Sequence, residues 1–293
     1  MAINASKSSA FTTGVKVVGG ELVTNEIFAV DASSIGIDIR GGAVEIADGA
    51  DVRHRGAALQ TAPSRNTRCA AAIGKRSIGV FVDNSRDARV GDPVAILREL
   101  YVDKFEFGIC AVGAGALIDR GRITASAVGI RAEDRIRISN VRVGQSSLAA
   151  LIALSDESEI IDSKFYDSAV GVFLDSKKLP TFRGNQFVFN GVGIYYAKPI
   201  KDQRSLLEVL LKQSSADTKA LVAGFTDNEV ACNREAGVFQ KYRLFRKAHR
   251  NRCRYNSSEE CAGEKKNKVC TEFRNRLNSE YLDVTGSYCA LGG

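Results

Sequence analysis

Hydrophobic and polar positions alternate along most of the chain in short runs, and one phrase returns at regular intervals. The phrase is a small residue, a glycine and an apolar–x–apolar triplet, as in "VGIRA", "VGVFL" and "VGIYY". Its glycines are Gly36, Gly56, Gly79, Gly108, Gly129, Gly171, Gly193 and Gly237, with Ala150 where a further glycine is expected. From Gly108 onward the successive spacings are 21, 21, 21, 22 and 44 residues, and the last is two periods.

Period-two alternation within each unit, as in "RIRISNVRV" and "SEIIDSKF", is typical of β-strands and not of helical repeats. Two or three short strands in each period of 21 or 22 residues describe one coil of a parallel β-helix. Stacked coils would pair their backbones about 4.8 Å apart, with apolar side chains inside. Asparagine tolerates the left-handed conformation and forms side-chain ladders. The expected corner residues are Asn185 and Asn190, Asn228 and Asn233, and Ser163 and Ser168 one coil earlier.

The stretch "NQFVFNGVGIYY" (185–196) has relatives at 163–174 and 228–239. It resembles the repeats of right-handed parallel β-helix proteins, the pectate-lyase-like superfamily, over roughly residues 30–240. The resemblance and the glycine spacing predict an all-β solenoid of about ten coils. The superfamily contains polysaccharide lyases, glycoside hydrolases, uronate epimerases, phage tailspike proteins and non-catalytic surface proteins, so the resemblance implies an architecture and leaves the activity open.

Three regions are expected. Residues 1–30 would form an N-terminal cap or first turn, residues 31–240 the β-helix, and residues 241–293 a basic, disulfide-linked C-terminal tail or a separate interaction module. Residues 198–220 exceed the repeat, and their "SLLEVLLKQ" core, which begins with a capping box at Ser205–Glu208, predicts a helical insertion.

Seven cysteines occur, and four of them gather in the last 41 residues: Cys253, Cys261, Cys270 and Cys289. Their spacing lacks the close pairs of structural zinc sites, so we expect two disulfides, with all three pairings open. Disulfides indicate an oxidising compartment: secreted, periplasmic or cell-surface. The other three cysteines are scattered.

The net charge of +7 and the pI of about 9.0 favour anionic partners. These partners are acidic polysaccharide, nucleic acid or anionic lipid. The resemblance to the pectate-lyase-like superfamily implies acidic polysaccharide, and nucleic acid is not expected because the chain carries no nucleic-acid-binding fingerprint. No apolar run has the roughly 18–20 residues of a membrane span, and no signal peptide is visible at the start of the sequence. The sequence makes no prediction of oligomeric state.

Candidate site residues come from the predicted outward face of the glycine-containing strands. The residues expected to point outward there are Asp38, Phe81, Cys110, Arg131, Ile152, Phe173, Tyr195 and Phe239. Phe173 and Tyr195 would stack on adjacent coils as an aromatic platform for sugar rings, unless the tail or the insertion covers them. Arg131 and Lys198 would help bind the substrate. Asp134, Asp156 and Asp175 follow three successive strands, with Lys177 nearby.

These carboxylates could perform general acid–base catalysis, or bind Ca²⁺, the one candidate cofactor, as the resemblance to lyases implies, with a Lys or Arg as the base. The alternative is a row of solvated turn residues. The catalytic motifs of pectin hydrolases and alginate epimerases are missing, and His54 and His249 are the only histidines. Two hypotheses follow: an exported protein that binds, and as an enzyme cleaves or epimerises, an acidic polysaccharide, or a non-catalytic surface scaffold that binds glycan or protein. A trimeric phage-type fibre is a third, weaker hypothesis.

Overall fold

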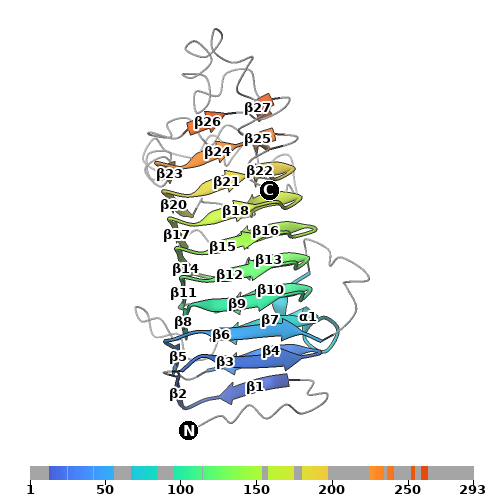
Figure 1. Ribbon diagram of the computed structural model, residues 1–293, viewed down its shortest axis with the longest axis vertical. Coiled ribbons are helices and arrows are strands. Elements are labelled where there is room, and N and C mark those ends of the chain that lie inside the picture. Colours follow the sequence, from blue (N-terminus) through green and yellow to red (C-terminus); the bar gives the residue numbers. More distant parts are fainter. Residues whose placement is uncertain are drawn as a thin grey trace, which may run out of the picture.

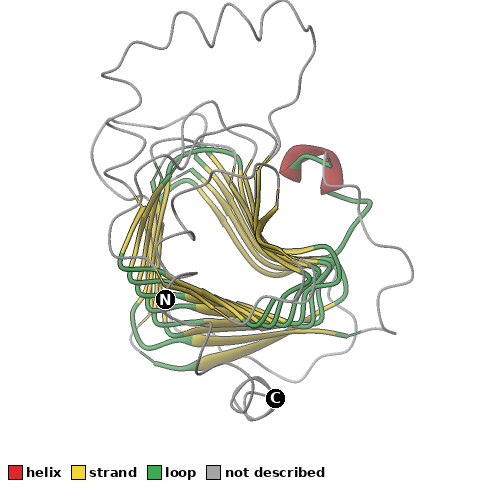
Figure 2. Cartoon of the chain, turned by 90° about the horizontal axis from the view of Figure 1, so that it is seen from above, coloured by secondary structure: helices red, strands yellow, loops and turns green. Residues whose placement is uncertain are grey.

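A computed structural model of the protein describes residues 13–24, 26–41, 43–55, 67–84, 95–113, 115–153, 158–174, 180–196, 225–233, 236–240, 252–254 and 259–262. In these residues short strands stack rung upon rung into a parallel β-solenoid (Figure 1). Seen along its axis, three sheets enclose one core (Figure 2). The predicted fold class, an all-β parallel β-helix, is confirmed.

All neighbouring strands in the three sheets are parallel, and within each sheet they lie side by side in the order of the sequence. Sheet A contains β1 (Thr13–Val18), β4 (Ile35–Arg40), β7 (Ile78–Asp83), β10 (Phe107–Val112), β13 (Val128–Ala132), β16 (Ala149–Ala153), β19 (Val170–Leu174), β22 (Val192–Tyr196), β25 (Ala236–Gln240) and β27 (Glu259–Ala262). Sheet B contains β2 (Glu21–Thr24), β5 (Ala43–Ile46), β8 (Ala95–Arg98), β11 (Ala116–Asp119), β14 (Ile136–Ser139), β17 (Glu159–Ile161), β20 (Thr181–Arg183) and β23 (Phe225–Thr226). Sheet C contains β3 (Phe28–Ala32), β6 (Ala50–His54), β9 (Leu100–Asp103), β12 (Arg122–Thr124), β15 (Arg142–Gly144), β18 (Lys164–Tyr166), β21 (Gln186–Val188), β24 (Glu229–Ala231) and β26 (Arg252–Arg254). A single helical turn, α1 (Cys69–Ala72), lies between β6 and β7.

The number of turns is smaller than predicted. Sheet B has eight strands among the described residues, so at most eight turns are complete there, against the expected ten or so. Strands β1 and β2 lie within the region expected to be a cap or first turn, and β26 and β27 within the region expected to be a tail. The solenoid therefore includes parts of both terminal regions. The helical insertion predicted at 198–220 lies outside the described residues.

The core consists of side chains that the period-two alternation turns inward. In sheet A the inward residues form a column in register: Ile37, Val80, Ile109, Ile130, Leu151, Val172 and Ile194. All of them are fully buried. From sheet C, Phe165 and Phe187 stack inside the coil with ring centroids 5.5 Å apart. Alternation on every rung thus places a continuous apolar interior along the axis.

The repeated glycine lies within a strand and not at a corner, and it allows the rungs to pack closely. Gly129 lies within β13, where a Cβ atom would stand 2.3 Å from Cγ1 of Val143 and 2.5 Å from the carbonyl oxygen of Ala150. Gly79 and Gly108 meet the same kind of obstruction from a side chain of sheet C and from the backbone of the next rung. A side chain at these three positions would force the rungs apart, which explains their glycines, whereas the equivalent position of β16 holds Ala150, whose small side chain is buried in the core.

The predicted asparagine ladders are present, buried at the corners. At the corner between sheets C and A, Oδ1 of Asn190 accepts the Ser168 N–H (3.1 Å), and Nδ2 of Asn190 donates to the Phe165 carbonyl (3.0 Å). The Asn190 N–H in turn donates to Oδ1 of Asn233 (3.0 Å), while Oγ of Ser168 accepts the Ser146 N–H (3.0 Å). The ladder side chains therefore satisfy backbone groups that the strands leave unpaired.

The corner between sheets B and C repeats this arrangement. Oδ1 of Asn185 accepts the Ser163 N–H (3.0 Å), and Oδ1 of Asn228 accepts the Asn185 N–H (3.0 Å). The left-handed backbone at both corners belongs to the residue before the ladder side chain, as at Asp162 (φ 47°) and Phe189 (φ 61°). The ladder residues thus contribute side-chain hydrogen bonds, and their neighbours make the turn.

Candidate functional site

The outer face of sheet A carries the column of residues that the sequence predicted to point outward. The strand register aligns Asp38, Phe81, Cys110, Arg131, Ile152, Phe173 and Tyr195. This face is not open to solvent, however. Phe81, Phe107 and Ile152 are fully buried there and belong to a second hydrophobic cluster, separate from the core inside the coil. The outer face of sheet A is therefore packed like an interior.

Phe173 and Tyr195 stack as predicted. Their ring centroids are 5.3 Å apart and the rings are inclined by only 12°. The Phe173 side chain is buried, with 8% of its residue surface exposed, and Tyr195 is half-buried. The pair is consequently a part of the second hydrophobic cluster and presents little ring surface on which a sugar could lie.

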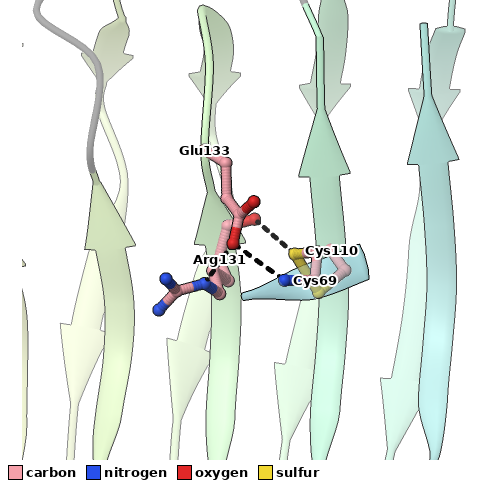
Figure 3. Close-up of a disulfide and its surroundings, with 4 residues drawn as sticks. All are labelled: Cys69, Cys110, Arg131 and Glu133. Atoms are coloured by element: carbon pink, nitrogen blue, oxygen red, sulfur yellow. Dashed lines mark hydrogen bonds and ion pairs between the residues drawn. A yellow bond between two sulfur atoms is a disulfide. The ribbon is translucent and has the colours of Figure 1, made fainter. Parts of the chain in front are cut away.

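Arg131 is buried, and Glu133, two residues further along the chain, neutralises its charge. Its Nε donates to Oε1 of Glu133 at 2.7 Å, and only 3% of the Arg131 side chain is exposed. The same Glu133 oxygen accepts the backbone N–H of Cys69 at 2.8 Å (Figure 3). Because burying a guanidinium requires such a partner, the arrangement fits a structural role for Arg131.

A disulfide between Cys69 and Cys110 attaches α1 to β10 (Figure 3). The two cysteines are 41 residues apart and fully buried in the second hydrophobic cluster. Sequence reasoning identified Cys110 as outward-facing but found no partner for it, because Cys69 lies outside the repeat. Cys232 is disulfide-bonded as well.

The disulfides predicted for the tail stay a prediction. Cys253 and Cys261 lie on β26 and β27, whereas Cys270 and Cys289 lie outside the described residues.

Of the proposed catalytic residues, only Asp134 is described. It is exposed just after β13, and its Oδ1 accepts the backbone N–H of Arg135 at 2.8 Å, a local turn contact. Asp156, Asp175, Lys177 and Lys198 lie outside the described residues, so their convergence and their roles stay predictions. Among the described residues, His, Cys, Asp and Glu side chains do not gather in any group of three or more that could hold a metal ion.

Two ion pairs lie on the outer face of sheet B. Glu45 on β5 contacts Arg98 on β8, and Arg137 on β14 lies 3.3 Å from Glu159 on β17. Both pairs join neighbouring rungs, and in each of them the two opposite charges neutralise one another.

Asp119 is the centre of the hydrogen bonding at the end of β11. Ser139 Oγ donates to its Oδ1 at 2.7 Å, Asn140 Nδ2 to the same oxygen at 3.3 Å, and Arg120 Nε to Oδ2 at 3.2 Å. Partial burial alone would raise the pKa of Asp119, but these hydrogen bonds and the nearby guanidinium outweigh burial and hold the pKa below its ordinary value.

Comparisons with protein-family models, with curated proteins and with solved structures found no match. The class that the chain shows is therefore the parallel β-solenoid itself, and the likeness to the pectate-lyase-like superfamily depends on the repeat sequences alone. In the described part of the chain, no helix is long and apolar enough to cross a membrane.

Proposed function

We propose that this protein is an exported β-helix that acts as a rigid binding protein for an acidic polysaccharide. The observation that carries the proposal is the packed outer face of sheet A. An enzyme working on that face would need solvated acid and base groups next to a cleft. The face instead buries Phe81, Phe107 and Phe173 and neutralises Arg131 with Glu133. A filled face of this kind suits a rod better than a catalytic groove.

Two further observations support export and the ligand class. The Cys69–Cys110 disulfide is of the kind that persists in oxidising compartments, where extracellular polysaccharides are found. The net charge of +7 favours a polyanionic ligand. Stacked rungs with buried ladders give a stiff support on which charges keep fixed spacings, and this lowers the entropic cost of binding a polymer.

The proposal is tested by titrating the protein with uronate polymers and by following the same mixtures for unsaturated product absorbance and new reducing ends. We expect binding that weakens with salt, and no turnover. Turnover that disappears in Asp134→Asn would replace this proposal with the enzyme hypothesis. No binding to any acidic polysaccharide at low salt would overturn it.

A second candidate function is a surface scaffold that binds another protein. It is favoured by three exposed apolar side chains in the first turn: Val18 (65% exposed), Val23 (46%) and Ile27 (76%). Exposed apolar side chains grouped at one end of a molecule are typical of protein contacts. Replacing all three with serine would abolish such a contact, as measured by pull-down of the partner, and would leave polysaccharide binding unchanged.

A further inference from the structure

We propose that the ligand lies along the outer face of sheet C, on a column of three basic side chains: Arg122 on β12, Arg142 on β15 and Lys164 on β18. The inference rests on the proposed binding function and names the surface and the kind of polymer. Arg122 pairs in register with Arg142, and Arg142 with Lys164. We refer to these three residues as the basic column.

The alternation of each strand turns the basic column outward. Its sequence neighbours Ile123, Val143 and Phe165 are fully buried in the core, so the residues beside them point away from it. Arg122 and Arg142 are exposed. Successive rungs are about 4.8 Å apart, so three cationic groups follow one another along roughly 10 Å of the solenoid axis.

The basic column lacks the acidic neighbours that sheet B provides. Among the residues that the structure describes, every ion pair involves other side chains than these three. Lys164 instead has its Nζ 5.6 Å from the ring centroid of Tyr166. Like charges directly opposite one another on neighbouring strands are destabilising. An anionic ligand would relieve this repulsion, and a polymer with regularly spaced charges would do so on every rung.

Both ends of the basic column have a distinct neighbour in register. Next to Arg122 stands Tyr101 on β9, which is 56% exposed, and next to Lys164 stands the exposed Gln186 on β21. An exposed phenol ring offers an apolar face with a polar tip, on which a sugar ring can lie. The rungs beyond carry the acidic residues Asp51, which is paired with Arg53, and Glu229, so the run of basic and uncharged side chains spans five rungs.

This arrangement suits a linear anionic polysaccharide that runs parallel to the solenoid axis. Nucleic acid also binds to cationic side chains beside an aromatic ring. The disulfides favour the polysaccharide, because they indicate a compartment outside the cytosol.

The test uses the full chain and a size-defined linear oligouronate, with affinity measured by calorimetry at low and at physiological salt. The variant is Arg122→Gln/Arg142→Gln/Lys164→Gln. A matched control removes the same total charge from the outer face of sheet B: Arg98→Gln/Arg137→Gln/Arg183→Gln. We expect the first variant to bind about 100-fold more weakly, from roughly fivefold for each lost charge contact, and its affinity to depend less on salt.

The control should change the affinity by less than about threefold, because it alters only the long-range field. Tyr101→Ala keeps all charges and should weaken binding about fivefold at either salt concentration, since a ring contact is not screened. Equal losses in both triple variants would overturn the basic column as the binding surface and leave the binding function standing. Absence of oligouronate binding by the unmodified protein would overturn both, and tight binding of single-stranded nucleic acid alone would assign the basic column to that ligand instead.

Discussion

Asn190→Ala tests whether the buried ladder holds the rungs together. The side chain has no exposed surface, and it satisfies two backbone groups: the Ser168 N–H (3.1 Å) and the Phe165 carbonyl (3.0 Å). Alanine leaves both groups buried without a partner. Each such group costs about 1–3 kcal/mol, so we expect a loss of about 4 kcal/mol in the local free energy of opening.

The assay has to be local, because a solenoid unfolds in segments and a single global free energy is poorly defined for it. Native-state hydrogen exchange at the Ser168 amide reads the affected bond directly. A loss of about 4 kcal/mol corresponds to a drop of roughly a thousandfold in protection, provided that exchange follows local opening. Asn190→Ser should lose less, because Ser168 in the preceding rung already uses its Oγ to accept the Ser146 N–H.

Gln186→Ala is the matched control, since it shortens an exposed side chain in the same coil and should change stability by less than about 0.5 kcal/mol. If Asn190→Ala leaves the Ser168 amide as protected as this control does, then the backbone ladder alone holds the rungs, and our account of the buried asparagines is refuted.

Three further predictions concern other parts of the fold. Cys69→Ser/Cys110→Ser should destabilise the attachment of α1 by about 4 kcal/mol, the chain-entropy value for a loop of this length, and limited proteolysis should then cut near residues 67–77, whereas unchanged resistance would contradict this. Gly129→Ala should cost about 2 kcal/mol in the local free energy of opening through overpacking against the next rung, and unchanged hydrogen exchange at the amides of β13 would show that the rungs can shift. Asp119 has a lowered pKa, so its stabilisation is present above its ordinary value of 3.8 and is lost as the pH falls through the lower folded value. The stability gap between the unmodified protein and Asp119→Asn should therefore be full near neutral pH and shrink as the pH falls below the ordinary value of 3.8, and a gap that does not change with pH would refute the assignment.

The sequence by itself determined the solenoid, because in a stack of coils the same local neighbours return once per period. A glycine that leaves room for the neighbouring rung, such as Gly129, therefore recurs about every 21 residues. So does an asparagine that hydrogen-bonds to the neighbouring rung, such as Asn190. The inward alternation of each strand and the outward direction of Cys110 and Arg131 followed from the same period.

Only the tertiary structure decided which outward face is open. The period-two alternation of a strand shows that a side chain points out of the coil, but it does not show which residues pack against that side chain there. The burial of Arg131 with Glu133 and the bond between Cys69 and Cys110 depend on a segment outside the repeat that returns to sheet A, and no periodic signal marks such a return. The sequence left an open aromatic platform and a covered pair as alternatives for Phe173 and Tyr195, and it could not choose between them because burial is set by long-range packing, whereas direction is set by the local backbone.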